Sequence, residues 1–253
     1  MNNISKTINE AVTILDTLKD HSQLTLTQIA ELTGMNKSSV YRLLAALIKN
    51  ELVDKDDSSK MYRLGIGLLR YTPTLLNNKN LVKIARPFLA QLVAETQESS
   101  QLCIATHRNT IITVDAQNSR GLINLSANIG TEDPLHCTAV GKAYLAFLSE
   151  QQQNLIVDAI ELKRFTSNTI VTKKDLMAEL AKIRQQGYAE DNEEIIEGIK
   201  CYAAPVLDEN SSPIAVIGIT GPVSRMSEEK SEKYAATVMN IALQLSNKLG
   251  LPL

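Results

Sequence analysis

The side chains with the clearest chemical use in this sequence lie close together around residue 40. Ser38, Tyr41, Arg42 and Lys49 fall on one face of a predicted helix, opposite an apolar stripe. A short hydroxyl pairs with donors or acceptors on base edges, and a guanidinium pairs with guanine or holds a phosphate. Such residues suit the major groove of DNA, but they are also typical of any solvated helix face. The surrounding pattern must decide between the two interpretations.

That pattern is the segment Leu26–Ala45, LTQIAELTGMNKSSVYRLLA, which has the residue sizes of a helix-turn-helix. Ala30 is small where two helices would cross, and Gly34 lies in the turn, where a positive φ disfavours a β-carbon. Val40 and Leu43 are apolar where the second helix would pack against the first. Agreement at four places favours the DNA-reading interpretation.

The ends of both predicted helices are marked by their own side chains. Thr25 and Gln28 have the spacing of a capping box at the start of the first helix. Asn36 is placed to cap the second helix, which would begin at Lys37. These local signals agree with the placement of the helix-turn-helix.

Elements on both sides complete a winged helix. Upstream, apolar residues recur with helical spacing at Ile8, Val12, Leu15 and Leu18. Downstream, a polar turn joins two predicted strands, Leu52–Lys55 and Met61–Leu64. We therefore expect residues 1–65 to form a winged helix-turn-helix domain.

The hairpin of this domain, here called the wing, could add phosphate contacts through Lys60 and Arg63. Asp54, Asp56 and Asp57 lie in the same turn and would repel phosphate, so the second helix is the stronger candidate. The residues predicted to contact DNA are Thr25, Asn36, Lys37, Ser38, Ser39, Tyr41, Arg42, Lys60 and Arg63.

Charge and composition limit the classes of protein. The 253 residues have a net charge of −2, with +2 in residues 1–80 and −4 in the remainder, which excludes a histone-like polycation. No stretch approaches the ~18 consecutive apolar residues of a membrane span, and no secretory segment is visible, so we expect a cytoplasmic protein without a membrane partner. Three scattered cysteines fit reduced thiols better than disulfides.

The remainder of the chain predicts a second domain. The stretch 66–80, IGLLRYTPTLLNNKN, is apolar with helical spacing until the pattern is lost at Asn77–Asn80, and it predicts a helical linker. Predicted helices in residues 81–253 are Leu81–Glu98, a helix that begins after Thr138, Lys174–Gln186 and Ser227–Leu249. Predicted strands are Gln101–His107, Thr110–Ala116, Leu122–Ala127, Gly198–Leu207 and Ile214–Thr220. Strands joined by hairpins and flanked by helices predict an α+β domain on an antiparallel sheet.

Together these motifs resemble the IclR family of bacterial transcription regulators over nearly the whole chain. The resemblance is carried by LTQIAELTGMNKSSVYRLLAALIKNELV, PLHCTAVGKAYLAFL, KRFTSNTIVT, IRQQGYAEDNEEIIEGIKCYAAPV and AVIGITGP. It implies a winged helix (1–65) joined by a helical linker (66–80) to a GAF-like effector-binding domain (81–253). It also implies homodimers through the N-terminal domain, association of dimers into tetramers, and control of a catabolic operon, by repression rather than activation. The expected partners are double-stranded operator DNA and a small carboxylate effector, a keto, sugar or aromatic acid.

The resemblance also implies where the effector binds. Family members hold it beside the sheet, with backbone amides at the start of a helix, and such amides attract a carboxylate. The matching positions are Leu122, Leu125, Ala139, Val140, Asp191, Cys201, Gly218 and Thr220. Many members have two hydroxyl residues where this chain has Gly218 and Thr220. We therefore expect an effector bulkier than a two- or three-carbon keto acid, such as a sugar acid or an aromatic acid.

Other interpretations of these residues remain. Cys201 could be a small buried hydrophobe, Asp191 could belong to a solvated acidic run, and Lys142 could lie along solvent or reach an acidic ligand. An enzyme would need Cys201 or Cys137 as nucleophile with His136 or His107 as base. A metal sensor would use His136, Cys137 and Cys201, but no paired ligand spacing supports zinc. We expect no catalytic residue, no metal and no cofactor.

Overall fold

The computed structural model describes residues 5–71, 81–119, 125 and 128–249. The chain divides into two compact units, Met1–Lys79 and Asn80–Leu253, and each is described by itself. Each unit buries a hydrophobic cluster of its own.

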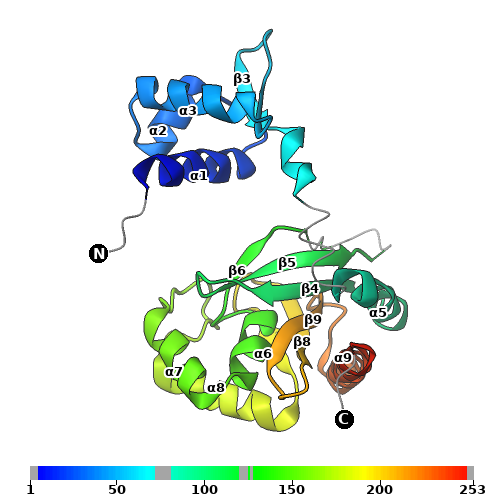
Figure 1. The fold of residues 1–253 in the computed structure, drawn as a ribbon. Coiled ribbons are helices and arrows are strands. Elements are labelled where there is room, and N and C mark those ends of the chain that lie inside the picture. Colours follow the sequence, from blue (N-terminus) through cyan, green and yellow to red (C-terminus); the bar gives the residue numbers. More distant parts are fainter. Residues whose placement is uncertain (1–4, 72–80, 120–124, 126–127, 250–253) are drawn as a thin grey trace. The chain divides into compact units, whose positions relative to one another are not determined.

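The first unit is a winged helix-turn-helix (Figure 1). Its helices are α1 (Lys6–Lys19), α2 (Leu26–Thr33) and α3 (Lys37–Lys49). Its strands are β1 (Leu24–Thr25), β2 (Val53–Lys55) and β3 (Met61–Leu64), which form an antiparallel sheet in the order β1-β3-β2. The hairpin β2–β3 matches the predicted wing within one residue, whereas the two-residue strand β1 is too short to leave a pattern in the sequence.

Local side chains fix the two helices of the helix-turn-helix as predicted. Gln28 N donates to Thr25 Oγ1 at 3.3 Å and Thr25 N donates to Gln28 Oε1 at 2.8 Å, so the capping box is confirmed. Ser39 N donates to Asn36 Oδ1 at 2.8 Å, which caps α3. Gly34 has a φ of 68° in the turn, the conformation that a β-carbon opposes.

The first helix turns only part of its predicted stripe, Leu15 and Leu18, toward the core. Ile14 and Leu18 are buried, while Ile8 is 63% exposed and Val12 is 37% exposed. Leu15 is partly buried against the core. The core of this unit therefore covers the C-terminal part of the predicted stripe together with Ile14, and periodicity alone did not show that Ile8 and Val12 stay exposed.

The segment after the wing is hydrogen-bonded to the turn that follows α3. A 3-10 helix, η1 (Ile66–Arg70), follows β3, and Gly67 N donates to Glu51 O at 3.0 Å. A β-carbon on Gly65 or on Gly67 would lie 2.2 Å or 2.5 Å from Glu51 O. Arg70 adds a hydrogen bond from Nη2 to Asn50 O at 2.7 Å and an ion pair with Glu51 at 3.2 Å. The described part of the predicted helical linker is thus a 3-10 turn, and residues 72–80 lie outside the described residues.

The second unit is an α+β domain built on one six-stranded antiparallel sheet. The strand order is β6-β5-β4-β9-β8-β7. The strands are β4 (Ser99–Ala105), β5 (Thr110–Gln117), β6 (Glu132–Pro134), β7 (Ala189–Asn192), β8 (Ile199–Leu207) and β9 (Pro213–Pro222).

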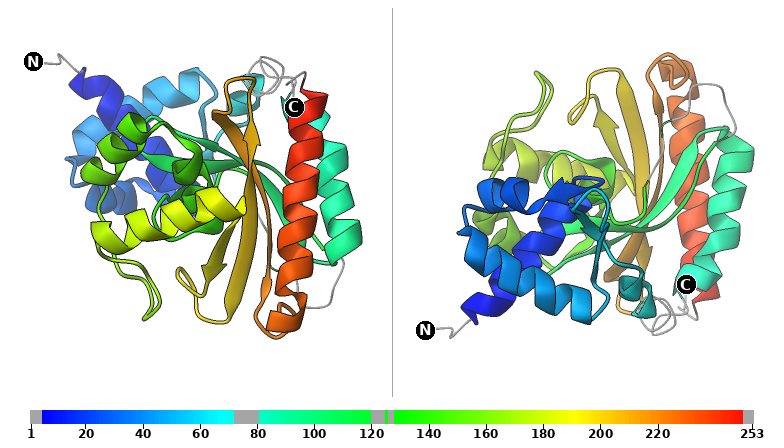
Figure 2. Two further views of the ribbon diagram at one scale, coloured as in Figure 1. Left: turned by 90° about the horizontal axis from the view of Figure 1, so that it is seen from below. Right: turned by 90° about the horizontal axis from the view of Figure 1, so that it is seen from above.

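Helices cover both faces of this sheet (Figure 2). The long helices α5 (Leu81–Thr96) and α9 (Glu228–Lys248) lie side by side on one face. On the other face lie α6 (Ala139–Phe147), α7 (Glu150–Ala159) and α8 (Lys173–Gln186), and α6 packs directly against β8 and β9. The core between α6 and the sheet contains Val140, Ala203 and Val216. The face that carries α6 is also the face that carries the candidate site.

Three elements of this unit have no counterpart in the sequence prediction. The strands β6 and β7 are three and four residues long and lie at the two edges of the sheet. The helix α7, EQQQNLIVDA, is mostly polar and buries only Gln153 and Val157. Of the predicted strand over residues 122–127, the structure describes only Leu125, and this residue is not in a strand.

Candidate functional site

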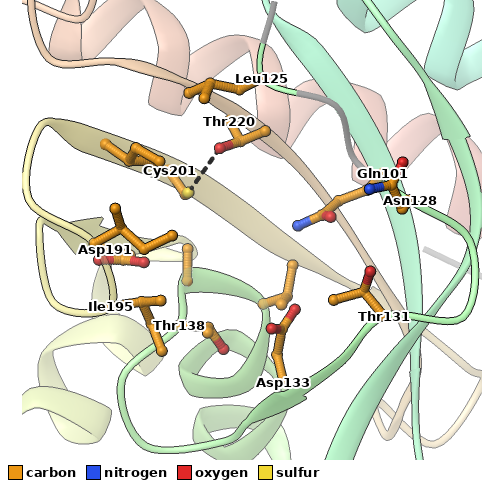
Figure 3. Close-up of a pocket in the computed structure, with 14 residues that line it drawn as sticks. Gln101, Leu125, Asn128, Thr131, Asp133, Thr138, Asp191, Ile195, Cys201 and Thr220 are labelled. Carbon is orange, nitrogen blue, oxygen red and sulfur yellow. Dashed lines mark hydrogen bonds between the residues drawn. The ribbon is translucent and has the colours of Figure 1, made fainter. Parts of the chain in front are cut away.

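A cavity of about 270 Å³ opens in the second unit between the sheet and the start of α6 (Figure 3). Residues from the edge strands β6 and β7, from the inner strands β4, β8 and β9, from the first turn of α6 and from neighbouring loops line it. They are Gln101, Leu125, Asn128, Thr131, Asp133, Thr138, Ala139, Val140, Asp191, Ile195, Ile196, Ile199, Cys201 and Thr220.

The first turn of α6 forms one wall of this cavity. Thr138 caps the helix, because its Oγ1 accepts from Gly141 N at 3.0 Å and donates to Pro134 O at 2.8 Å. The backbone N–H groups of Ala139 and Val140 lie in the first turn of the helix, so no carbonyl of the helix precedes them to accept their hydrogen bonds. Since amide protons and the positive end of the helix dipole attract anions, this wall suits a carboxylate.

Two neighbouring strands contribute a thiol and a hydroxyl. Cys201 on β8 pairs with Thr220 on β9, and its Sγ donates to Thr220 Oγ1 at 3.2 Å (Figure 3). Because Thr220 Oγ1 accepts this bond, its own hydroxyl proton can be donated to a ligand in the cavity. Burial raises the pKa of the Cys201 thiol, and nearby Asp191 raises it further.

Asp191 is a buried carboxyl group at the edge of the cavity. It lies on β7 opposite Cys201, is 4% exposed, and accepts a hydrogen bond at 2.7 Å from Glu194 N to Oδ1. Burial raises its pKa to about 7, and the neighbouring Glu194 carboxylate adds to the effect. At neutral pH this group can therefore donate or accept a proton.

Behind the wall lies a buried ion pair between Lys142 of α6 and Glu194. The two side chains are 1% and 7% exposed. Within the described part of the chain, the second oxygen of Glu194 has no hydrogen-bond partner. Lys142 thus neither lies along solvent nor lines the cavity.

Another part of the lining contains residues that the sequence did not single out. Asp133 on β6 lines the cavity with Gln101, Asn128 and Thr131 (Figure 3), and burial raises the pKa of its carboxyl group. Asn128, Thr131 and Asp133 come from a loop and a three-residue strand with no motif of their own, and Gln101 lies in a predicted strand that carried no site motif. The only signal in the sequence concerned Asp133, which directly precedes PLHCTAVGKAYLAFL.

The structure brings six of the eight predicted effector-binding positions to the cavity: Leu125, Ala139, Val140, Asp191, Cys201 and Thr220. Leu122 lies outside the described residues. Gly218 does not line the cavity, because a β-carbon there would lie 3.1 Å from Ala203 Cβ and 3.4 Å from Val140 Cγ1. The expectation that Gly218 makes room for a larger ligand is therefore wrong, since Val140 packs over this glycine and fills the space.

The predicted DNA-contacting residues of α3 lie on its exposed side. Tyr41 is 62% exposed, and Lys37, Ser38 and Arg42 are also exposed, while Ser39 is half-buried. Asn36 is engaged in the cap and also accepts from Ser38 Oγ at 2.7 Å. The hydroxyl of Thr25 is likewise used in the capping box.

In the wing, the two basic candidates differ in their surroundings. Arg63 pairs with Asp54 across the hairpin at 3.9 Å, so an acidic neighbour competes with phosphate for it. Lys60 is exposed and has a φ of 57° in the turn.

Among the candidates of the rival interpretations, Cys137 and His136 are buried, Cys201 is half-buried and His107 is exposed. Burial raises the pKa of both Cys137 and Cys201, so the nucleophilic thiolate is disfavoured in both. Burial lowers the pKa of His136, whose Nε2 lies 2.9 Å from Lys163 O. Among the described residues, no three His, Cys, Asp or Glu side chains are grouped so that they could hold a metal ion. No helix in the described part of the chain is long and apolar enough to cross a membrane.

Comparisons with known proteins assign both units to the same group of proteins. The family model described as "IclR helix-turn-helix domain" matches residues 7–57. The model described as "Bacterial transcriptional regulator IclR C-terminal" matches residues 74–247.

Individual relatives and solved structures agree. The HTH-type transcriptional regulator KdgR of Dickeya chrysanthemi is 32% identical over 237 residues, which are 94% of this chain and 77% of the relative. The transcriptional repressor IclR of Escherichia coli K12 is 29% identical over 92% of this chain and 85% of its own length. The crystal structure of the Thermotoga maritima IclR has a TM-score of 0.76 and 32% identity, and covers 96% of this chain and 98% of that one.

Proposed function

Because the chain belongs to the IclR family of bacterial transcriptional regulators, we propose that it represses a catabolic operon under the control of a small organic acid. The observation that carries the proposal is the cavity at the first turn of α6, in a unit separate from the one that contains α3. The relative from E. coli that is described as a repressor supports repression rather than activation. The protein would act in the cytoplasm, on double-stranded operator DNA.

Reading of the operator is assigned to the exposed side of α3. Exposed hydroxyl and guanidinium groups at the N-terminal half of this helix match the groups that read base edges in the major groove. Lys60 of the wing and the exposed Lys37 would add phosphate contacts, which position a protein on DNA without reading sequence.

Arg42→Ala should weaken binding to the specific operator by roughly 1 to 3 kcal/mol, because a guanidinium that reads a base contributes about that much discrimination. Binding to specific and random duplexes can be compared by fluorescence anisotropy at one salt concentration. Lys19→Ala is the matched control, because it removes an exposed charge from the last turn of α1. A loss that is equal on random DNA would reassign Arg42 to a phosphate contact.

Dimerisation through the N-terminal unit has a candidate surface on α1. Ile8 and Val12 are exposed apolar residues one turn apart, on a helix whose core contacts are made by Ile14 and Leu18. A second copy of the chain would bury them and place two recognition helices on one operator. Association of such dimers into tetramers is part of the same proposal.

Control by the effector would be a shift between two arrangements of the dimer. A ligand can shift such an equilibrium only by its differential affinity for the two states. We assign the carboxylate of the effector to the amides of Ala139 and Val140, and its remaining polar groups to Asp191, Cys201 and Thr220. The apolar side chains of Leu125 and Ile199 would contact its carbon chain.

A thermal-melting screen of keto, sugar and aromatic acids tests the effector site. One class of acid should raise the melting temperature, because a ligand that binds only the folded state stabilises it. Cys201→Ala should reduce this shift, whereas Cys103→Ala, at a buried thiol outside the cavity lining, should leave it unchanged. If no acid shifts the melting temperature, the proposed effector class is wrong, and DNA binding has to be explained without it.

A further inference from the structure

The cavity has an unusual balance of charge for a site that binds an acid. Two carboxyl groups, Asp133 and Asp191, line it, and none of its described lining residues is Lys, Arg or His. The buried cation nearest in sequence to the cavity wall, Lys142, is paired with Glu194 behind that wall. Among the described lining residues, a bare carboxylate ligand would therefore meet two acidic groups, balanced by backbone amides and neutral side-chain donors and not by a cationic side chain.

The two carboxyl groups differ in what already binds them. Asp191 accepts a hydrogen bond from Glu194 N, as described above. Asp133 makes no hydrogen bond or ion pair through its carboxyl group within the part of the chain that the structure describes, and it is only half-buried. The acceptor oxygens of Asp133 are thus available to a ligand.

The neighbours of Asp133 favour hydroxyl groups as its partners. Gln101, Asn128 and Thr131 lie on the same side of the cavity (Figure 3), and each can both donate and accept a hydrogen bond. The other side includes Ile195, at which an aliphatic C–H surface would be buried (Figure 3). A chain with hydroxyl groups toward one wall and carbon toward the other fits this division.

We propose that Asp133 is a specificity-determining residue, which restricts the effector to acids whose carbon chain carries hydroxyl groups. The inference rests on the proposed function, since it names the ligand class of the same site. A hydroxyl that donates to the Asp133 carboxylate forms a charge-assisted hydrogen bond, which is stronger than a bond between neutral groups. An acid without hydroxyl groups leaves Asp133 desolvated and unpaired near a second negative charge, and is rejected.

Isothermal titration of the full-length protein at pH 7 tests the proposal with acids paired by chain length. D-gluconate is compared with hexanoate, and glycerate with propionate. At least one hydroxylated acid should bind more tightly than its partner by about 10- to 100-fold, the ratio expected when a charged acceptor is left unpaired. Equal or tighter binding of both unhydroxylated partners would overturn the proposal.

Variants at Asp133 then assign the selectivity to this side chain. Asp133→Leu should reduce the preference for the hydroxylated acid to about threefold or less, and Asp133→Asn should give an intermediate value because its oxygen still accepts. Glu132→Gln is the matched control, because Glu132 is exposed, lies outside the cavity lining and should keep the wild-type preference. The thermal melting curve of each variant reports whether it is folded.

Three results separate the possible failures. If Asp133→Leu keeps the wild-type preference, the specificity proposal is wrong while the effector site stands. If Asp133→Leu weakens both acids of a pair equally, Asp133 acts as a protonated donor to the ligand carboxylate, which also overturns it. If no acid binds the wild-type protein in the titrations or in the melting screen, the proposed function itself fails.

Discussion

Lys142→Met should lower the free energy of unfolding by about 3 to 5 kcal/mol, because it leaves a buried charge without its partner. Lys142 is 1% exposed and its partner Glu194 is 7% exposed. One oxygen of Glu194 already has no hydrogen-bond partner among the described residues, so the carboxylate depends on Lys142. In the variant, Glu194 would have to take up a proton or draw water into the core behind the cavity.

Urea-induced unfolding of the full-length protein, followed by circular dichroism, measures this effect. The double variant Lys142→Met with Glu194→Leu should recover most of the loss, because replacing a whole buried pair with apolar side chains is often neutral. Lys173→Met is the matched control, because Lys173 pairs with Asp158 at 2.8 Å on the surface and should cost less than about 1 kcal/mol. A double variant as unstable as the single one would show that the packing of the Lys142 stem, and not its charge, is what matters.

Asp191→Asn should stabilise the protein above pH 7, by up to roughly 4 kcal/mol at pH 8. The folded state raises the pKa of Asp191 from 3.8 to about 7, chiefly by burial. As the pH rises above about 4, the unfolded chain ionises this group while the folded chain keeps it protonated. Folding is therefore progressively disfavoured between pH 4 and pH 7, and the full cost is present above pH 7. Asparagine carries no such cost, and its oxygen can still accept from Glu194 N.

Urea unfolding of wild type and Asp191→Asn at pH 5 and at pH 8 measures the difference, which should be larger at pH 8. Thr220→Val is the matched control, because it alters the same cavity without a titrating group and should change stability equally at both pH values. A difference between wild type and Asp191→Asn that is the same at pH 5 and pH 8 would show that Asp191 is ionised in the folded state throughout this range.

The helix-turn-helix was predictable from the sequence because its determinants are local. The capping box of Thr25 and Gln28, the cap at Asn36 and the left-handed turn at Gly34 each depend on residues within four positions of one another. The buried face of α1 was predicted only in part. Its sequence shows which residues are apolar, but which of them become buried depends on how α2 and α3 pack against it.

The cavity was predictable only where a motif reached it. Ala139 and Val140 follow the cap at Thr138, and Cys201 and Thr220 lie in the two longest strands, β8 and β9, so the resemblance located them. Asp133 lies in a three-residue edge strand, and its position beside the cavity depends on the pairing of that strand with β5. The raised pKa of Asp191 is equally invisible in an acidic run, because burial and not neighbouring sequence causes it.

The close contact between η1 and the turn after α3 bears on the construction of chimeric regulators. Gly65 and Gly67 lie so near Glu51 O that no larger residue fits, and Arg70 holds the carbonyl of Asn50. The segment up to Tyr71 is therefore held rigidly against the C-terminal end of α3. A graft that joins this DNA-binding unit to a foreign sensor domain should cross over after Tyr71, because a junction at Leu64 would remove the segment that is hydrogen-bonded to the end of α3.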